Sequence, residues 1–128
     1  MPTTQTALLI MAHGSRASAA NEEFLAFVNK LAEQNQHYTA VRGVFLELSE
    51  PSLVQAVHSL ADQGINTFQL YPLFFNCGKH VQKDIPAQIA EAQASRPNIE
   101  IRMLDYFGSS KTLVDAVNQH ILQQTENR

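Results

Sequence analysis

The sequence is short of cysteine and of long apolar runs, and both shortages exclude classes of protein. Cys77 is the only cysteine among the 128 residues, so no intramolecular disulfide can form and the chain suits a reducing compartment. No segment reaches the roughly 18 consecutive apolar residues of a membrane span. The first residues also lack the basic and apolar stretches of a signal peptide. We therefore expect a cytoplasmic protein that does not associate with membranes.

Charged residues are scarce and nearly balanced. They make up 16% of the chain, and nine Lys and Arg against twelve Asp and Glu leave a net charge of −3. This mildly acidic balance argues against nucleic acid as a principal partner. Apolar residues, at 45%, are enough for a hydrophobic core in a chain of this length. The composition predicts a single domain over residues 1–128 that folds without a disulfide or a structural metal ion.

Four short apolar or β-branched runs alternate with four segments of helical periodicity. The runs cover residues 7–12, 39–46, 66–71 and 99–104, and their length is typical of strands. In the other segments, apolar residues recur at spacings of three and four, at Phe24, Phe27, Val28 and Leu31, at Leu53, Val57, Leu60 and Ala61, at Ile85 and Ile89, and at Leu113, Val114, Val117 and Ile121. Strands that alternate with helices predict a three-layer α/β/α fold, with a four-stranded parallel sheet between helices on both faces.

The hydrophobic patterns of the strands predict their order in the sheet. Residues 7–12 are apolar throughout, which is typical of a strand buried on both faces, whereas residues 99–104 mostly alternate, as an edge strand does. The order 2-1-3-4 satisfies both patterns. It places the topological switch point between the first and third strands, where open sheets bind ligands at the carboxyl ends of the strands.

Proline, glycine and aspartate mark the expected ends of two helices. Pro51 suits the first turn of the second helix, and Gly64 suits its exit. Asp84 and Pro86 suit the beginning of the third helix.

Polar residues with metal-binding side chains follow the first three strands. His13 comes after the first strand, Glu47 after the second and His80 after the third. Because the carboxyl ends of parallel strands meet at one edge of the sheet, we expect these side chains to converge there. Neutral imidazoles and a carboxylate suit first-row divalent metals, and three protein ligands leave positions open for exchange. This donor set accepts cobalt, nickel, iron and zinc alike.

Each candidate also has a structural interpretation. A single histidine at a strand end is more often satisfied by a backbone group, and only the combination favours a metal site. His37, His58 and His120 are interpreted as solvated or helix-face residues. Glu50, directly before a proline, suits a charge at the beginning of a helix.

The loops beside the candidate ligands contain residues whose role the sequence leaves open. Gly14 and Gly78 either permit tight turns beside a ligand or end strands. Arg16, Lys79 and Lys83 either meet carboxylates of a ligand or are solvated surface charges.

Three further residues near the site have alternative interpretations. Cys77 is either a soft metal ligand or, as we expect, a small residue in a crowded loop. Phe74 and Phe75 either form the wall of an apolar cavity or fill the core, and we expect at least one of them in the core.

Three motifs in this order resemble one known family. They are Met-Ala-His-Gly-Ser-Arg at 11–16, Phe-Leu-Glu-Leu-Ser-Glu-Pro-Ser at 45–52, and Pro-Leu-Phe-Phe at 72–75 with Gly-Lys-His-Val at 78–81 and Asp-Ile-Pro at 84–86. With these motifs the chain resembles the small-type sirohydrochlorin cobaltochelatases, the CbiX-like class II tetrapyrrole chelatases. The resemblance covers nearly the whole chain.

The resemblance implies insertion of a divalent metal ion, typically cobalt(II), into sirohydrochlorin during cobalamin biosynthesis, without ATP or an organic cofactor. Iron(II), for sirohaem, and nickel(II) are the alternative metals. The absence of a G-x-x-x-x-G-K-[ST] phosphate loop agrees with this. The family's metal-binding histidines correspond to His13 and His80, and its carboxylate corresponds to Glu47, with Glu50 as the alternative.

The resemblance also implies partners. Larger relatives look like two fused copies of this unit, so a homodimer with sheets facing across a cleft is implied. The substrate carries several carboxylates, for which Arg16, Lys79 and Lys83 are candidate partners, together with the loop residues Gly14, Ser15 and Gly78.

Two other functions remain open. A metal or tetrapyrrole carrier would use the same ligands without turnover. Enzymes that use a phosphohistidine also place His-Gly after a first strand, but they usually have Arg directly before the His, where this chain has Ala12.

Overall fold

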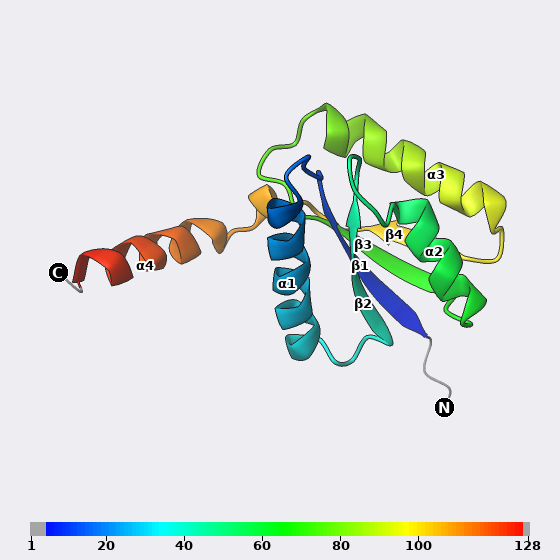
Figure 1. Cartoon of the computed structure of the whole chain (residues 1–128), viewed down its shortest axis with the longest axis horizontal. Helices are drawn as coiled ribbons and strands as arrows, with labels where there is room; N and C mark the ends of the chain where they lie inside the picture. Colours follow the sequence, from blue (N-terminus) through cyan, green and yellow to red (C-terminus); the bar gives the residue numbers. More distant parts are fainter. Residues whose placement is uncertain (1–4, 127–128) are drawn as a thin grey trace.

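The computed structural model describes residues 5–126, in which strands and helices alternate as the sequence predicts (Figure 1). The strands are β1 (Thr6–Ala12), β2 (Ala40–Phe45), β3 (Thr67–Pro72) and β4 (Glu100–Met103), and the helices are α1 (Ser18–Gln34), α2 (Leu53–Asp62), α3 (Ile85–Ser95) and α4 (Leu113–Glu126). A π-helical turn (His80–Asp84) precedes α3, and a 3-10 turn (Phe107–Ser109) precedes α4. Residues 1–4 and 127–128 lie outside the described part of the chain. The predicted domain bounds of 1–128 and the expectation about a signal peptide fall partly on these residues. None of the helices within residues 5–126 combines the length and apolar composition needed to cross a bilayer.

The strand order is β2-β1-β3-β4 and every neighbouring pair is parallel, which confirms the predicted topology. β1 lies between β2 and β3, with Met11 paired to Val44 on one side and to Pro72 on the other. β4 lies at the edge, where Ile101 is buried and its neighbours Glu100 and Arg102 are exposed. The alternating pattern of this strand therefore reflects its edge position.

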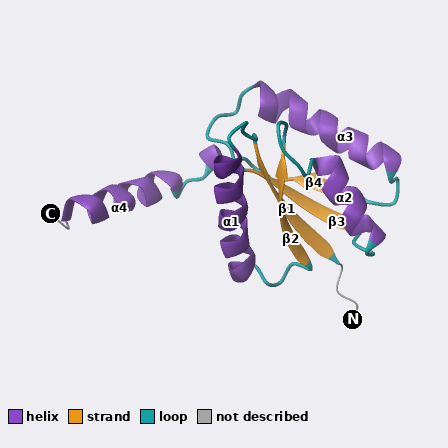
Figure 2. Cartoon of the chain, in the orientation of Figure 1, coloured by secondary structure: helices purple, strands orange, loops and turns teal. Residues whose placement is uncertain are grey.

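Side chains of β1 contribute to hydrophobic clusters on both faces of the sheet. Leu9 and Met11 belong to the larger cluster, which includes buried residues of α2 and α3. Leu8 and Ile10 belong to a smaller cluster with Val28 of α1. Figure 2 shows the corresponding layers, with α1 on one side of the sheet and α2 and α3 on the other.

One of the two expected helix starts is wrong and the other is confirmed. Ser52 is the N-cap of α2 and forms a capping box with Gln55, so Pro51 lies before the helix and not in its first turn. α3 begins where the sequence predicts, with Asp84 at its N-cap and Pro86 in its first turn, and the π-helical turn over His80–Asp84 leads directly into it. Gly64 follows α2 with a positive φ of 100°, a conformation that favours glycine, and this agrees with its expected place at the exit.

The fourth helix forms where its periodicity predicts, but it does not pack on the sheet. Figure 1 shows α4 projecting away from the other elements, and no residue of it is buried. The expectation that all helices cover the two faces of the sheet is therefore wrong for α4. Its apolar residues have no partner surface within the described residues of the chain.

Candidate active site

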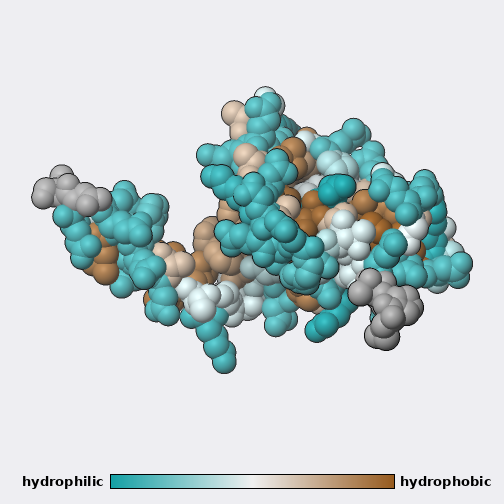
Figure 3. Space-filling model, turned by 90° about the horizontal axis from the view of Figure 1, so that it is seen from below, coloured by the Kyte–Doolittle hydropathy of each residue, from teal (hydrophilic) through white to brown (hydrophobic). Residues whose placement is uncertain are grey.

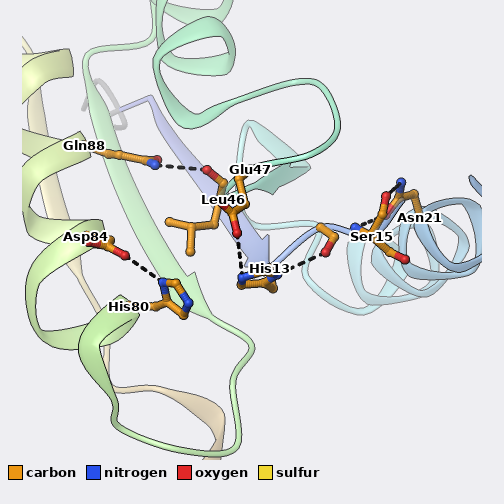
Figure 4. A network of polar contacts seen from close by, with 9 residues as sticks. His13, Ser15, Asn21, Leu46, Glu47, His80, Asp84 and Gln88 are labelled. Atoms are coloured by element: carbon orange, nitrogen blue, oxygen red, sulfur yellow. Dashed lines mark hydrogen bonds and ion pairs between the residues drawn. The ribbon is translucent and has the colours of Figure 1, made fainter. Parts of the chain in front are cut away.

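The three predicted side chains meet at the carboxyl edge of the sheet (Figure 4). His13 follows β1 directly, Glu47 lies just beyond β2, and His80 begins the π-helical turn after β3. His13 Nε2 lies 3.0 Å from Glu47 Oε2, and the two imidazole rings have centroids 4.8 Å apart. The topology thus brings these residues together as the strand positions predict.

The contacts of His13 indicate a site for one cation. Its Nδ1 lies 3.1 Å from the carbonyl oxygen of Gly14, and its Nε2 faces Glu47. If Nδ1 carries the proton of a neutral ring and donates it to this carbonyl, the lone pair of Nε2 faces a carboxylate oxygen. Such a pair is stabilised by a positive charge, either a second proton on the ring or a metal ion between the two atoms, whereas the other neutral tautomer donates its Nε2 proton to Glu47 directly.

His80 is oriented by an acidic residue that its sequence position marks only as a helix-start signal. Asp84 Oδ2 lies 2.7 Å from His80 Nδ1, close enough to accept its proton and fix the tautomer. The other ring nitrogen, Nε2, forms no hydrogen bond within residues 5–126, so it is free to take a ligand. Carboxylates commonly orient metal-binding histidines in this way. The separation of four residues on one helical turn was the signal that could have identified Asp84.

The loops after β1 and β2 approach closely, and Gly14 makes this possible. Beyond the strands, Glu47 N–H donates to the His13 carbonyl at 3.1 Å, which aligns the two backbones. Gly14 has a φ of 99°, and a Cβ there would collide with the carbonyl oxygen of Glu47. A Cβ on Gly78 would meet nothing within 4 Å. The close-approach interpretation therefore applies to Gly14 and not to Gly78.

Two amide side chains that the sequence pattern does not single out hold the site loops. Asn21 of α1 accepts from Ser15 N–H at 3.0 Å and donates to the Ser15 carbonyl at 2.8 Å. Gln88 of α3 donates through Nε2 to the carbonyl of Leu46 at 3.1 Å, directly before Glu47. Gln88 Oε1 is buried and has no hydrogen-bond partner in the described part of the chain. No local pattern distinguishes these residues from solvated helix positions.

The geometry distinguishes between the two candidate carboxylates. Glu47 contacts His13, whereas Glu50 accepts a hydrogen bond from Gln55 at the beginning of α2, 3.3 Å away. Leu48 follows Glu47 with a left-handed φ of 71° and is 52% exposed. An apolar side chain held in a strained conformation beside polar residues is a common feature of functional loops.

The other candidates lie on the surface. Arg16, Lys79 and Lys83 are exposed and form no ion pair within residues 5–126. Cys77 is exposed too, so the expectation of a crowded loop is wrong there, because the segment after β3 runs over the surface. Phe74 is partly buried against the larger core cluster, as expected of one of the two phenylalanines.

The three histidines interpreted as solvated or helix-face residues lie away from His13 and His80. His37 is exposed and its ring contacts Tyr38, with centroids 4.4 Å apart. His58 contacts the hydroxyl of Ser95 at 2.8 Å, and His120 is exposed on α4.

The site is open and is not a closed metal cage. The side chains of His13 and His80 are each 43% exposed, and that of Glu47 is 52% exposed. Within residues 5–126, no three His, Cys, Asp or Glu side chains form a cluster of metal-ligating geometry. To admit an ion, His13 and Glu47 must move apart from their direct contact. Such an arrangement suits a metal ion that arrives and leaves, whereas a structural metal ion is bound in a closed ligand set.

Known proteins similar to this chain fall into one group. The family model CbiX matches residues 7–124. A sirohydrochlorin cobaltochelatase of Sulfolobus acidocaldarius is 30% identical over 88% of this chain and 86% of its own length. A sirohydrochlorin ferrochelatase of Priestia megaterium is 27% identical over 90% of this chain, but over only 43% of its own length.

Solved structures agree with the sequence matches. A CbiX protein from Marinobacter aquaeolei superposes with a TM-score of 0.80 at 30% identity, over 96% of this chain and 99% of that one. The sirohydrochlorin chelatase SirB of Bacillus subtilis, solved in complex with cobalt, has a TM-score of 0.83 at 28% identity. That match covers 93% of this chain and 50% of SirB. The chain therefore spans most of the cobaltochelatase from Sulfolobus and about half of the longer chelatases.

Proposed function

Since the chain belongs to the CbiX family, we propose that it inserts a divalent metal ion, cobalt(II) in the first instance, into sirohydrochlorin. The observation that carries the proposal is the contact between His13 and Glu47 beside His80, at the edge where the strand ends converge. Relatives named as cobaltochelatases and as ferrochelatases both match the chain, so iron(II) is the main alternative metal substrate. Nickel(II) suits the same ligands.

Metal insertion needs a loosely held ion and a base. The free tetrapyrrole carries inner N–H protons that must leave while its ring nitrogens replace the previous ligands of the ion. His13 Nε2 and Glu47 Oε2 face each other at 3.0 Å, so a metal ion and a proton compete for the place between them. When the metal ion passes to the macrocycle, the pair is left to accept one pyrrole proton and the second pyrrole proton passes to solvent at this open site; a histidine suits such an exchange at neutral pH.

His80 supplies the second imidazole with a defined tautomer. With the Nδ1 proton donated to Asp84, its Nε2 lone pair is available to the ion, and no protonation change at Nδ1 is required. The partial exposure of the three side chains leaves room for a flat substrate to approach the ion from solvent. The exposed Leu48 offers an apolar contact for that substrate at the same edge.

Recognition of the substrate carboxylates falls to residues in the same loops. Arg16, Lys79 and Lys83 are exposed, and within the described residues no acidic side chain neutralises them, so their charges are available to a ligand. The backbones of the segments around Gly14, Ser15 and Gly78 would lie beside the macrocycle. If Arg16 and Lys79 are replaced together by Ala, we expect the KM for sirohydrochlorin to rise; an unchanged KM would remove this assignment.

The visible spectrum of sirohydrochlorin tests the proposal. Under anaerobic conditions with cobalt(II), catalytic amounts of the protein should accelerate the spectral change over many turnovers. His13→Ala and His80→Ala should each abolish the acceleration, whereas His37→Ala, an exposed loop histidine, should leave it unchanged. Repeating the assay with iron(II) and nickel(II) ranks the metal substrates. A stoichiometric change without turnover would identify a metal or tetrapyrrole carrier instead of an enzyme.

A further inference from the structure

The side chain of Gln88 carries a buried oxygen atom whose cost the packing of the fold does not explain. Hydrophilic side chains make up much of the body surface in Figure 3, where they meet water. Gln88 Oε1 is instead buried, and among the side-chain nitrogen and oxygen atoms of residues 5–126 it is the one buried atom without a hydrogen-bond partner. Such an atom destabilises a fold, and a leucine or methionine of similar size would avoid the cost. The amide is therefore explained by what its other end does.

The other end of the amide holds one peptide unit of the candidate active site. Gln88 Nε2 donates to the carbonyl oxygen of Leu46 at 3.1 Å. The N–H of the same peptide unit belongs to Glu47 and donates to the His13 carbonyl at 3.1 Å. Because a trans peptide unit is planar and its C=O and N–H point in opposite directions, these two hydrogen bonds hold it from opposite sides. The Cα of Glu47 follows this unit directly, so the direction in which its side chain leaves the backbone is fixed as well.

The helical segment that holds this peptide unit also carries His80. His80, Asp84 and Gln88 are spaced by four residues each, and Figure 4 shows all three on the side of the segment that faces the site. Asp84 orients His80 through its contact of 2.7 Å with Nδ1. One turn further along, Gln88 holds the peptide unit before Glu47. This unit therefore connects the segment of His13 with the helix that carries His80.

We propose that Gln88 is a positioning residue for metal insertion, which acts through the carboxylate of Glu47. The ion must enter between His13 and Glu47, whose facing atoms lie 3.0 Å apart. With the peptide unit held on both sides, the Glu47 side chain can move aside for the ion while its backbone stays in place. Without Gln88 the Leu46 carbonyl is released, the peptide unit can turn, and the carboxylate loses its fixed position beside the two imidazoles. The inference rests on the proposed function, because it assigns the ion to the same site.

The position of Gln88 predicts which property its loss changes. Residues that hold a metal ligand through a hydrogen bond typically contribute about 10- to 100-fold to metal affinity or activity. Gln88 acts through the backbone of its ligand, so we expect its loss to weaken cobalt(II) binding about tenfold, at the lower end of that range. Stability should change little, because the Leu46 carbonyl loses its donor while the unsatisfied Oε1 disappears. A side chain that only packs α3 against the sheet would instead lower the stability and leave the cobalt affinity of the folded protein unchanged.

A double-mutant cycle on the full chain tests this role. Gln88→Leu and Gln88→Met both remove the donor and keep the approximate size of the side chain, so either can replace the other if one fails to fold. Each is made in the unmodified chain and together with Glu47→Ala, which removes the ligand that Gln88 positions. Gln93→Leu is the matched control, since Gln93 is a partly buried glutamine of the same helix whose side chain forms no hydrogen bond within residues 5–126. Circular dichroism and urea unfolding establish that the variants are folded.

The dissociation constant of cobalt(II) for the protein alone, measured by calorimetric titration, decides the outcome. Gln88→Leu should raise this constant about tenfold in the unmodified chain and by less than about twofold in the Glu47→Ala chain, while Gln93→Leu leaves it unchanged. An equal increase in both chains, or no increase in either, would overturn the positioning role.

The spectral assay separates this inference from the proposed function. Gln88→Leu should lower kcat for metal insertion and leave the KM for sirohydrochlorin unchanged, because Gln88 acts on the ligand of the ion. A protein with the coupled loss of cobalt affinity but without turnover would refute the proposed function and uphold the role of Gln88. Turnover with a cobalt affinity that does not depend on Gln88 would uphold the function and remove the role.

Discussion

The substitution Gly14→Ala tests how closely the site depends on one glycine. The φ of 99° at Gly14 lies in the region that favours glycine, so an L-residue there costs about 1 to 2 kcal/mol. The new Cβ would also collide with the carbonyl oxygen of Glu47. Relief of that collision moves the Glu47 backbone and weakens its hydrogen bond to the His13 carbonyl, at about 1 kcal/mol more. We therefore expect the free energy of unfolding to fall by roughly 2 to 3 kcal/mol.

Urea denaturation measures this loss, and Gly78→Ala is the matched control. Gly78 lies in the loop after β3 at the same edge of the sheet, but a Cβ there meets no atom within 4 Å. Gly78→Ala should leave the midpoint nearly unchanged, within about 0.5 kcal/mol, as for an ordinary surface substitution. The Gly14 variant should also insert metal more slowly, because Glu47 is displaced from His13. Equal stabilities of the two variants would refute the close-approach argument.

Four further substitutions test the surroundings of the site and one helix. Asp84→Ala frees His80 Nδ1 and should lower the metal-insertion rate or metal affinity by about 10- to 100-fold, while the urea midpoint changes little because the pair is partly exposed. Glu47→Gln removes the charge that faces His13 and should slow insertion, whereas Glu50→Gln should leave the rate unchanged; the opposite pattern in the spectral assay would reverse the assignment. Ser52→Ala removes the capping box of α2 and should cost about 1 kcal/mol in urea unfolding, with no effect on the insertion rate per folded molecule.

The architecture followed from local patterns because burial leaves a mark in the sequence. A strand between two helical layers must be apolar on both faces, and this identified β1 as central, while alternation identified β4 as an edge. Once the strands are parallel, their carboxyl ends share one edge, so the proximity of His13 and His80 followed as well. The order of the three motifs indicated the family, and the match to the CbiX model confirms it.

Only the tertiary structure decided the features that depend on distances between segments. Gly14 and Gly78 are alike in their sequence setting, yet only Gly14 is approached by another loop. Asp84 has the sequence position of a helix start, and its spacing of four residues from His80 becomes a contact only because a π-helical turn holds both residues. Helix α4 has an amphipathic stripe of the ordinary kind, which predicts that a surface covers it but not which surface. Periodicity records whether a side chain is buried, whereas the identity of its neighbour depends on how the chain turns between elements.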